Sequence, residues 1–212
     1  MKKIILAILV LTALAVTNTA HALLVGESEP NDSIATAQNI DSSFSVGANS
    51  DIESSTIIPW VSITGTGDGT YDYYSFLVST IGSRGIFDTD HTNVDTEIAV
   101  FDPSGNVLSQ NDDSSTALGA GGSTSGLDSY LNILFGSTGL HTVGVSRFPS
   151  GASTGTLTGT ALSTGNIYTL QVSIENHEVG TPNQNGVIPE PATMALLGTG
   201  LLGGFLRRKF LG

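Results

Sequence analysis

The residues of this chain best suited to chemistry lie near its start, in the segment Glu-Ser-Glu-Pro-Asn-Asp-Ser at residues 27–33. Four of its side chains end in a carboxylate or a carboxamide and fall within six positions: Glu27, Glu29, Asn31 and Asp32. In an extended chain, alternation places Glu27, Glu29 and Asn31 on one side. Hard oxygen ligands at this density suit Ca²⁺, which accepts about six to eight of them in a flexible geometry.

The same segment has a second interpretation that the residues alone leave open. Asp32 and Ser33 precede the sequence Ile-Ala-Thr-Ala-Gln and could cap a short helical turn there. A solvated acidic linker would need no cation at all. The segment therefore predicts either a calcium site or a solvated acidic stretch, and a capped turn is compatible with both.

Catalytic constellations are hard to assemble from the other polar residues. The four histidines are spread along the chain, at positions 21, 91, 141 and 177. Only His91 lies among carboxylates, and a solvated loop accounts for it. We expect no nucleophile elbow of the Gly-x-Ser-x-Gly type, and no His-Glu-x-x-His motif occurs. The sequence therefore predicts a protein that is not an enzyme.

The chain is acidic, and most of its few basic residues gather at its two ends. Residues 23–186 carry eighteen Asp or Glu side chains against Arg84 and Arg147 alone, which gives a formal charge of −16. A polyanion such as nucleic acid would be repelled by this charge. The acidity is explained either by solvation of an exported protein or by cation binding. Because cysteine is absent, disulfides cannot fasten the loops, and a divalent cation is the natural substitute.

The last 26 residues, 187–212, have three parts in strict order. The tripeptide Pro189-Glu190-Pro191 can precede a helix but cannot lie inside one. Residues 192–206 carry no charge, and Arg207-Arg208-Lys209 then forms a cationic stop that stays on the cytoplasmic side of a membrane. Fifteen apolar or small residues fall short of the roughly 20 needed to span a bilayer comfortably. This pattern favours a sorting tail that is removed after delivery, with a permanent anchor as the alternative.

This ordered combination resembles the PEP-CTERM sorting signal of Gram-negative bacteria that make exopolysaccharide. The resemblance implies transient insertion of the tail into the inner membrane, held there by Arg207-Arg208-Lys209. It implies recognition by an exosortase and cleavage near Pro189-Glu190-Pro191. The delivered protein would then lie at the cell surface or in the extracellular matrix, where exopolysaccharide or another matrix polymer would be its partner.

The N-terminus carries the complementary signal. Met1-Lys2-Lys3 is positive, residues 4–16 are apolar, and Ala20-His21-Ala22 is a small-x-small cleavage site. These features predict a secretory signal peptide that is cleaved after Ala22, with a retained membrane anchor as the alternative. The predicted organisation is a signal peptide at residues 1–22, one domain at 23–176, a linker at 177–186 and the sorting tail at 187–212.

The central part of the chain alternates in the manner of short β-strands separated by Gly-rich turns. Strands are expected at residues 57–63, 71–78, 96–101, 107–110, 130–135, 139–148 and 167–174. Turns or loops are expected at residues 65–70, 114–126 and 150–165. Since no long amphipathic helix is evident, we expect an all-β fold, an antiparallel β-sandwich of the jelly-roll kind.

Several of these segments, in their order, resemble the bacterial pre-peptidase C-terminal domain, which is related to the collagen-binding domains of clostridial collagenases. The matching segments lie at residues 27–33, 72–76, 95–108, 111–113 and 168–172. The family is a β-sandwich jelly roll and is usually an accessory domain of secreted proteases. Collagen binding does not carry over, because no collagen-contacting aromatic surface can be matched in this chain.

In the calcium-binding members of that family, a Glu-x-Glu-x-Asn-Asp segment and aspartates just before a Tyr-Tyr strand hold the metal. By position, the resemblance implicates Glu27, Glu29, Asn31, Asp32 and Asp72. The family's other aspartate would fall at Thr70, so Asp68 would have to substitute from two residues away.

Together these features predict a non-catalytic, calcium-stabilised β-sandwich that an exosortase sorts to the surface or the exopolysaccharide matrix of a Gram-negative bacterium. Its role there would be binding or structural. The alternative is an accessory subunit of a secreted protease, or a secreted hydrolase. Turnover of peptides or glycans by the purified protein would separate the two hypotheses.

Overall fold

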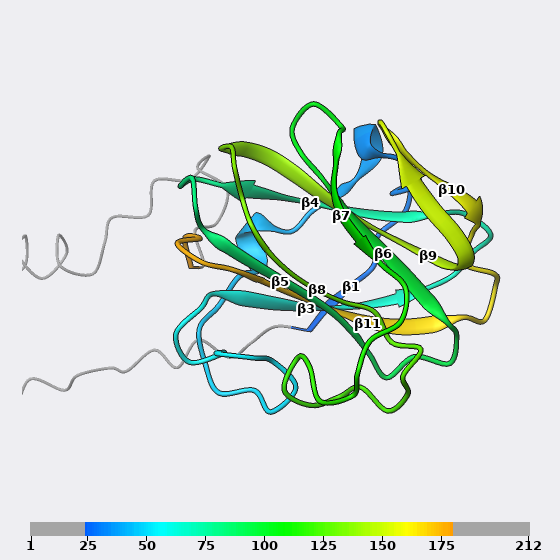
Figure 1. Cartoon of the computed structure of the whole chain (residues 1–212), viewed down its shortest axis with the longest axis horizontal. Helices are drawn as coiled ribbons and strands as arrows, with labels where there is room; N and C mark the ends of the chain where they lie inside the picture. Colours follow the sequence, from blue (N-terminus) through cyan, green and yellow to red (C-terminus); the bar gives the residue numbers. More distant parts are fainter. Residues whose placement is uncertain (1–23, 180–212) are drawn as a thin grey trace, which may run out of the picture.

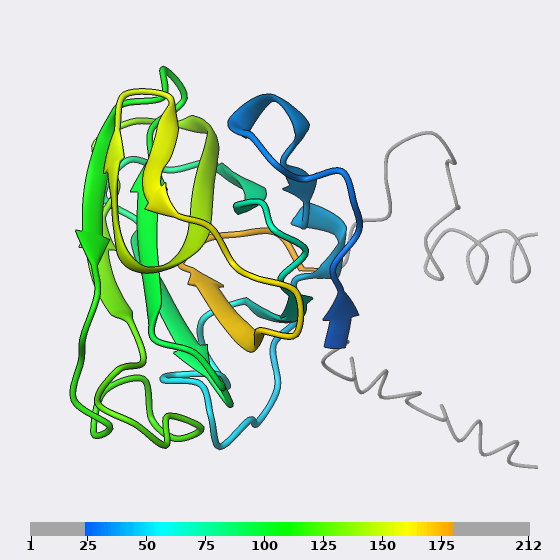
Figure 2. The same cartoon turned by 90° about the vertical axis from the view of Figure 1, so that its right-hand side faces the viewer.

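The computed structural model describes residues 24–179 (Figure 1). The predicted signal peptide, most of the predicted linker and the sorting tail lie outside these residues. Within them, two β-sheets face each other, and Figure 2 shows the green strands β6, β7 and β9 on one side and β11 and β1 towards the other. None of the helices in this part of the chain is long and apolar enough to cross a membrane.

The first sheet has five strands in the order β1-β3-β11-β5-β8. They are β1 (Leu24–Gly26), β3 (Trp60–Thr66), β11 (Ile167–Ile174), β5 (Arg84–Asp90) and β8 (Tyr130–Leu134). β1 runs parallel to β3, and the other neighbours are antiparallel. β11 has the bounds predicted from its alternation.

The second sheet has the order β2-β4-β9-β6-β7, and a further strand, β10, pairs with β9. These strands are β2 (Gln38–Asn39), β4 (Asp72–Val78), β9 (Gly139–Ser153), β6 (Thr96–Phe101), β7 (Val107–Asn111) and β10 (Thr156–Thr160). Two 3-10 turns, η1 (Ile34–Thr36) and η2 (Asp41–Ser43), flank β2. The predicted all-β sandwich is confirmed, and the short strands β1 and β2 are its parallel exceptions.

The core between the sheets follows the alternation of the sequence. Tyr74, Phe76 and Val78 on β4 are buried between the sheets, whereas Leu77 is exposed. The ring of Phe76 lies 5.5 Å from that of Phe87 on β5. Each such side chain stabilises the fold by about 1.5–3 kcal/mol when it is fully buried, so these contacts fix the position of β4 against the first sheet.

One predicted loop is in fact a hairpin, and this prediction was wrong. Within residues 150–165, β9 continues to Ser153 and pairs with β10. The hairpin covers the outer face of the second sheet, where Leu157 packs with Tyr73 and Phe101. The Gly/Ser/Thr composition suggested a loop, but threonine fits a pleated strand, and burial of Leu157 stabilises the hairpin.

The strand expected at residues 57–63 is displaced along the chain. β3 begins at Trp60 because Pro59, which precedes it, has no N–H to donate to a ladder. It continues through Gly65 and Thr66, into the predicted turn, since both residues pair with β11. Gly65 is required there because a Cβ would lie 2.1 Å from the ring of Tyr168.

Candidate metal centre

The segment that follows β1 is held to both sheets by main-chain hydrogen bonds. The amide of Glu27 donates to the carbonyl of Thr64 on β3, and the carbonyl of Asn31 accepts from the amide of Tyr73 on β4, both at 3.0 Å. This segment therefore crosses from one sheet to the other and brings residues 27–32 beside the start of β4. The predicted capped turn follows at η1, where the Ser33 amide donates to the Thr36 hydroxyl at 3.1 Å.

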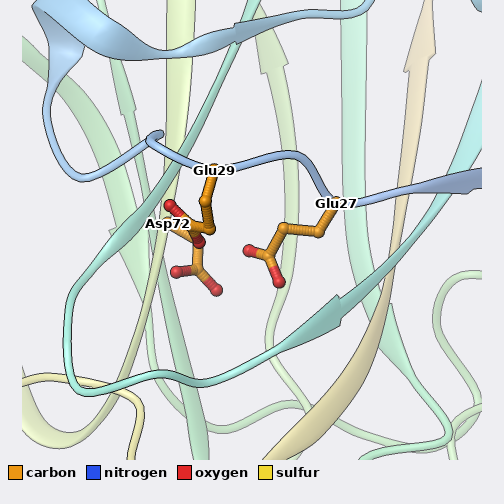
Figure 3. Close-up of side chains that lie close together, drawn as sticks. All are labelled: Glu27, Glu29 and Asp72. Atoms are coloured by element: carbon orange, nitrogen blue, oxygen red, sulfur yellow. The ribbon is translucent and has the colours of Figure 1, made fainter.

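A first group of carboxylates meets where the segment passes β4. Glu27, Glu29 and Asp72 each offer an oxygen, and these oxygens lie within 4.8 Å of one another. Figure 3 shows the three carboxyl groups gathered beneath the N-terminal segment. Asp72 is the first residue of β4 and is completely buried. A carboxylate on a rigid strand is thus placed opposite two carboxylates on a tethered loop.

A second group of carboxylates adjoins the first and shares Glu29 with it. Glu29, Asp32 and Asp68 also place their oxygens within 4.8 Å of one another. The Thr70 hydroxyl lies 2.6 Å from Asp68 Oδ1 and 3.0 Å from Asp32 Oδ1, and thereby joins them. Asp68, which lies two residues before Thr70 in the sequence, therefore belongs to this cluster. The structure brings all six predicted ligand residues together, Asn31 among them.

Asn31 is oriented by the acids around it. Its side-chain Nδ2 donates to Glu27 Oε1 at 3.2 Å, and its main-chain amide donates to Glu29 Oε2 at 2.9 Å. Its Oδ1 is left buried without a hydrogen-bond partner in the described part of the chain, and so is Oδ1 of Asp72. An unsatisfied buried polar atom costs about 1–3 kcal/mol. A bound cation would offset that cost at both oxygens.

Two tyrosines brace the centre from the core side. The Tyr168 hydroxyl donates to Asp72 Oδ2 at 2.7 Å, and the Tyr74 hydroxyl donates to Glu27 Oε1 at 3.1 Å. Burial and the neighbouring acids raise the pKa of both hydroxyls well above the usual value, so both keep their protons. The sequence alone predicted no role for either hydroxyl. The one available signal was tyrosine, rather than phenylalanine, at inward positions.

Among residues 24–179, no cationic side chain forms an ion pair with the carboxyl groups of the centre. Burial, with Glu27 and Glu29 nearby, raises the pKa of Asp72 to about 9. Burial and the other acids also raise the pKa of Glu29, whereas hydrogen bonds from Thr70 lower the pKa of Asp68. The ion pairs among residues 24–179 lie elsewhere and join Arg84 to Glu53, His91 to Asp51 and His177 to Asp41. A set of carboxylate and carboxamide oxygens with this charge fits a hard divalent cation.

A third group of acids lies at the ends of β6 and β7. Asp95, Asp112 and Asp113 place their oxygens within 4.8 Å of one another. Burial, with Asp113 and Asp95 nearby, raises the pKa of Asp112 to about 6. Asp95 and Asp112 are partly exposed and Asp113 is exposed, although Oδ1 of Asp95 and of Asp112 is buried without a hydrogen-bond partner among residues 24–179. This group joins only three carboxylates, and we assign it no ligand.

Two features that could suggest catalysis have structural explanations in this fold. The residues Gly-x-Ser-x-Gly do occur, at residues 151–155, contrary to expectation. They lie at the turn between β9 and β10, whereas a nucleophile elbow leads from a strand into a helix. His141 is buried beside Phe135 at 4.8 Å between ring centroids, and burial lowers its pKa. It is a packed core residue.

Fold and site together define the class of this protein: a β-sandwich with a carboxylate-rich centre where its N-terminal segment meets β4. Outside the described residues, positions 187–209 match the PEP-CTERM protein-sorting motif, which confirms the resemblance found in the tail. The chain therefore carries the signal of an exported protein that an exosortase sorts. No curated protein matches the chain significantly.

Two solved structures illustrate what the sandwich is similar to. One is PliG of Aeromonas hydrophila, a periplasmic inhibitor of g-type lysozyme, at 16% identity over 56% of this chain and 87% of that one, with a TM-score of 0.35. Another is the pre-peptidase C-terminal domain of collagenase from Bacillus anthracis, at 14% identity over 54% of this chain and 88% of that one, with a TM-score of 0.33. The latter is a domain of the kind that the central segments resemble. Neither similarity indicates a ligand for this chain.

Proposed function

We propose that this protein is a non-catalytic β-sandwich whose N-terminal segment is fastened by Ca²⁺, and that it has a binding or structural role at the cell surface or in the exopolysaccharide matrix. One observation carries the proposal. Six predicted oxygen ligands converge from the N-terminal segment, the turn before β4 and β4 itself, and Oδ1 of Asn31 and of Asp72 are buried without a partner among the described residues.

The ligand chemistry favours calcium over other common metals. The donors are oxygens only, from Glu27, Glu29, Asn31, Asp32, Asp68 and Asp72, and sulfur is not available because the chain has no cysteine. Zinc prefers nitrogen and sulfur ligands, and Mg²⁺ retains water rather than accept this many protein oxygens. A bound Ca²⁺ would supply the positive charge that offsets repulsion among these acids.

Such a cation would act as a fastener. It would join the loop after β1 to the rigid start of β4, and so would tie both sheets to the N-terminal segment. Because the metal binds only the folded arrangement, it stabilises the protein by about 2.7 kcal/mol when its free concentration is 100 times the dissociation constant. Extracellular calcium modules bind with dissociation constants of about 10⁻⁴–10⁻³ M, so a site of that affinity would need about 10–100 mM free Ca²⁺ for this stabilisation.

Destination and partners follow from the tail in this proposal. An exosortase would cleave near Pro189-Glu190-Pro191 once the apolar run had inserted and Arg207-Arg208-Lys209 had stopped transfer. A chain with alanines in place of Pro189-Glu190-Pro191 should then remain uncleaved in the membrane fraction. Intact-mass measurement of the processed protein checks this, and identical processing of both chains would contradict it.

Thermal unfolding with and without calcium tests the metal. For wild-type protein we expect saturating Ca²⁺ to raise Tm by about 5–10 °C over EDTA, since about 2–4 °C accompanies each kcal/mol in a domain of this size. Glu29→Gln should abolish the rise, because Glu29 belongs to both carboxylate groups. Glu178→Gln, a matched loss of one exposed charge, should keep it. The site would be rejected if the wild-type Tm did not change with calcium, or if calcium raised the Tm of Glu29→Gln as much as that of wild type.

Two further assays address the role. Turnover of peptides or glycans by the purified protein would contradict the non-catalytic assignment. Retention of the protein on immobilised exopolysaccharide in Ca²⁺, lost in EDTA, would assign a binding role. Incorporation into the matrix without such retention would assign a structural one.

A further inference from the structure

Two aspartates on β5 are buried on the outer side of the first sheet. Phe87 points into the core, so alternation turns Asp88 to the opposite face. Asp88 and Asp90 are nevertheless only 2% and 0% exposed. The cover is the Gly-rich segment of residues 114–126, which was predicted as a loop and contains no strand.

The loop touches the carboxyl groups with its glycines. A Cβ at Gly119 would lie 1.5 Å from Asp88 Oδ2, and a Cβ at Gly122 would lie 2.4 Å from Asp90 Cγ. Both glycines have positive φ, at 79° and 85°. Only glycine allows the main chain to approach the carboxyl groups this closely, so the loop is shaped to sit on them.

The two carboxyl groups are satisfied unequally. Asp90 accepts from Gln171 Nε2 at 3.0 Å and from Ser123 Oγ of the loop at 3.3 Å. Asp88 Oδ2 has no hydrogen-bond partner in the described part of the chain. Burial, with Asp90 and Asp128 nearby, raises the pKa of Asp88 to about 8, and burial raises that of Asp90 to about 6.

The charged surroundings cannot neutralise an ionised Asp88. The groups that influence this pair, or lie on the strands and loops beside it, are Asp128, Tyr130, Asp51, Glu53, His91 and Arg84. Of the cationic groups, Arg84 already pairs with Glu53, and His91 with Asp51. The loop itself has no titratable side chain. An ionised Asp88 would therefore place an unpaired negative charge directly beneath Gly119.

Hydrogen bonds close the base of the loop and fix one end of it. Its base is closed by a hydrogen bond from the Ser114 amide to the Gly126 carbonyl at 3.3 Å. The amides of Thr124 and Ser125 donate to Asp128 Oδ2 at 3.0 and 3.2 Å, which fixes one end. Figures 1 and 2 show this loop and the cyan segment of residues 47–58 at the same end of the sandwich.

We propose that residues 114–126 form a proton-operated lid, which sits on Asp88 while that carboxyl group is protonated and lifts when it ionises. In the lifted state Asp88 is solvated and titrates near its ordinary pKa of about 3.9. The closed state therefore holds more protons between pH of about 4 and about 8. Each rise of one pH unit across that range shifts the equilibrium between closed and open lid about tenfold towards the open lid. Lifting would expose a polar row on the first sheet that includes Asp88, Asp90 and Gln171.

The absence of cysteine from the chain permits a direct measurement on the full-length protein. Spin labels at Thr116→Cys in the loop and Leu134→Cys on β8 occupy two exposed positions, and the distance between them is followed by pulsed electron spin resonance. We expect one narrow distance distribution at about pH 5 and a longer, broader one at about pH 9. The same shift should occur in EDTA and in Ca²⁺.

Two variants move the lid in opposite directions. Asp88→Asn keeps the shape of the protonated carboxyl group and should keep the lid closed at about pH 9. Gly119→Ala adds the Cβ that collides with Asp88 and should open the lid at about pH 5. Glu178→Gln, with the same change of charge at an exposed site, should follow wild type, as should Asp112→Asn in the acidic group next to the loop.

Three results would overturn the lid. The first is an unchanged distribution between the two pH values in wild type. The second is a transition that persists in Asp88→Asn or disappears in Asp112→Asn. The third is closure by Ca²⁺ at about pH 9 in an Asp72→Asn background, which would make the Asp88 pair a cation site rather than a proton switch.

Discussion

The hydroxyl of Tyr168 on β11 donates to Asp72 Oδ2 on β4 at 2.7 Å, so this hydrogen bond joins the two sheets beneath the acidic centre. The same hydroxyl lies 2.7 Å from that of Tyr74. Because Asp72 Oδ2 is held by this bond, its Oδ1 is the oxygen left for a cation. The position of the candidate ligand thus depends on the packing of one sheet against the other.

Removing that hydroxyl should weaken the proposed metal site without removing a ligand. For Tyr168→Phe we expect calcium affinity to fall about 10–100-fold, as for the loss of a group that orients a ligand. Titration calorimetry measures the affinity. The free energy of unfolding in EDTA should also fall by about 1–3 kcal/mol, because Asp72 loses its buried donor.

Tyr71→Phe is the matched control for this prediction. The Tyr71 hydroxyl donates to the Gly159 carbonyl on β10 at 3.0 Å, away from the centre. This variant also loses one hydrogen bond, but its calcium affinity should equal that of wild type. Equal affinities in all three proteins would show that Tyr168 does not orient Asp72.

The sandwich itself was accessible from the sequence because alternation is a local property. Residues 167–174 alternate clearly, and β11 has those bounds. The β9–β10 hairpin was not accessible, because the one large apolar residue of β10, Leu157, is buried by partners far along the chain, such as Tyr73 and Phe101. A run of glycine, serine and threonine has no local pattern that reports such a contact.

The candidate site likewise contains residues that could be predicted from the sequence and contacts that could not. Glu27, Glu29 and Asn31 were evident from their density, which is local. Asp68 and Asp72 came from the family resemblance, since nothing in their spacing alone relates them to residues 27–32. The brace by Tyr168 could not be predicted, because alternation places a tyrosine in the core as it would a phenylalanine. Its hydroxyl partner is set by how the two sheets pack.

The hairpin over the second sheet offers a test of packing. Leu157 is 2% exposed against Tyr73 and Phe101, and Leu157→Ala should lower the free energy of unfolding by about 2–5 kcal/mol. Urea denaturation measures this loss. Leu134→Ala, at a leucine that is 71% exposed, should change it by less than about 0.5 kcal/mol. Equal effects at the two sites would contradict the buried hairpin.

Gly65 tests the close approach of β3 to the ring of Tyr168. In Gly65→Ala the new Cβ would meet atoms of the Tyr168 side chain at 2.1–2.4 Å, and that side chain is only 2% exposed. We expect a loss of about 1–3 kcal/mol from this overpacking, measured by thermal unfolding. Gly26→Ala, on β1, has no atom within 4 Å of its Cβ, and it should be neutral or slightly stabilising. A neutral Gly65→Ala would show that β3 and Tyr168 are not in contact.

Asp41 meets His177, the first residue of the predicted linker, in a clasp between η2 and the end of the domain. Asp41 Oδ1 lies 3.0 Å from His177 Nε2 and accepts from the Leu77 amide at 2.7 Å. The imidazole stacks on Phe44 with ring centroids 3.8 Å apart. Although burial acts to raise it, the pKa of Asp41 is lowered by hydrogen bonds from His177, Asn39 and Leu77.

A lowered pKa means that the folded state favours the ionised carboxylate. The stabilisation is therefore present above the ordinary pKa of about 3.9 and is lost as the pH falls through the lower folded value. Asp41→Asn should cost about 1.5–3 kcal/mol at pH near 7, the usual worth of hydrogen bonds to a charged group. The cost should shrink at an acid pH below the lowered pKa of Asp41, where wild type loses the same charge. Urea denaturation at both pH values measures the difference.

Asp113→Asn, at an exposed carboxylate, should show little cost at either pH. A cost for Asp41→Asn that is the same at both would mean that the clasp does not depend on the charge of Asp41.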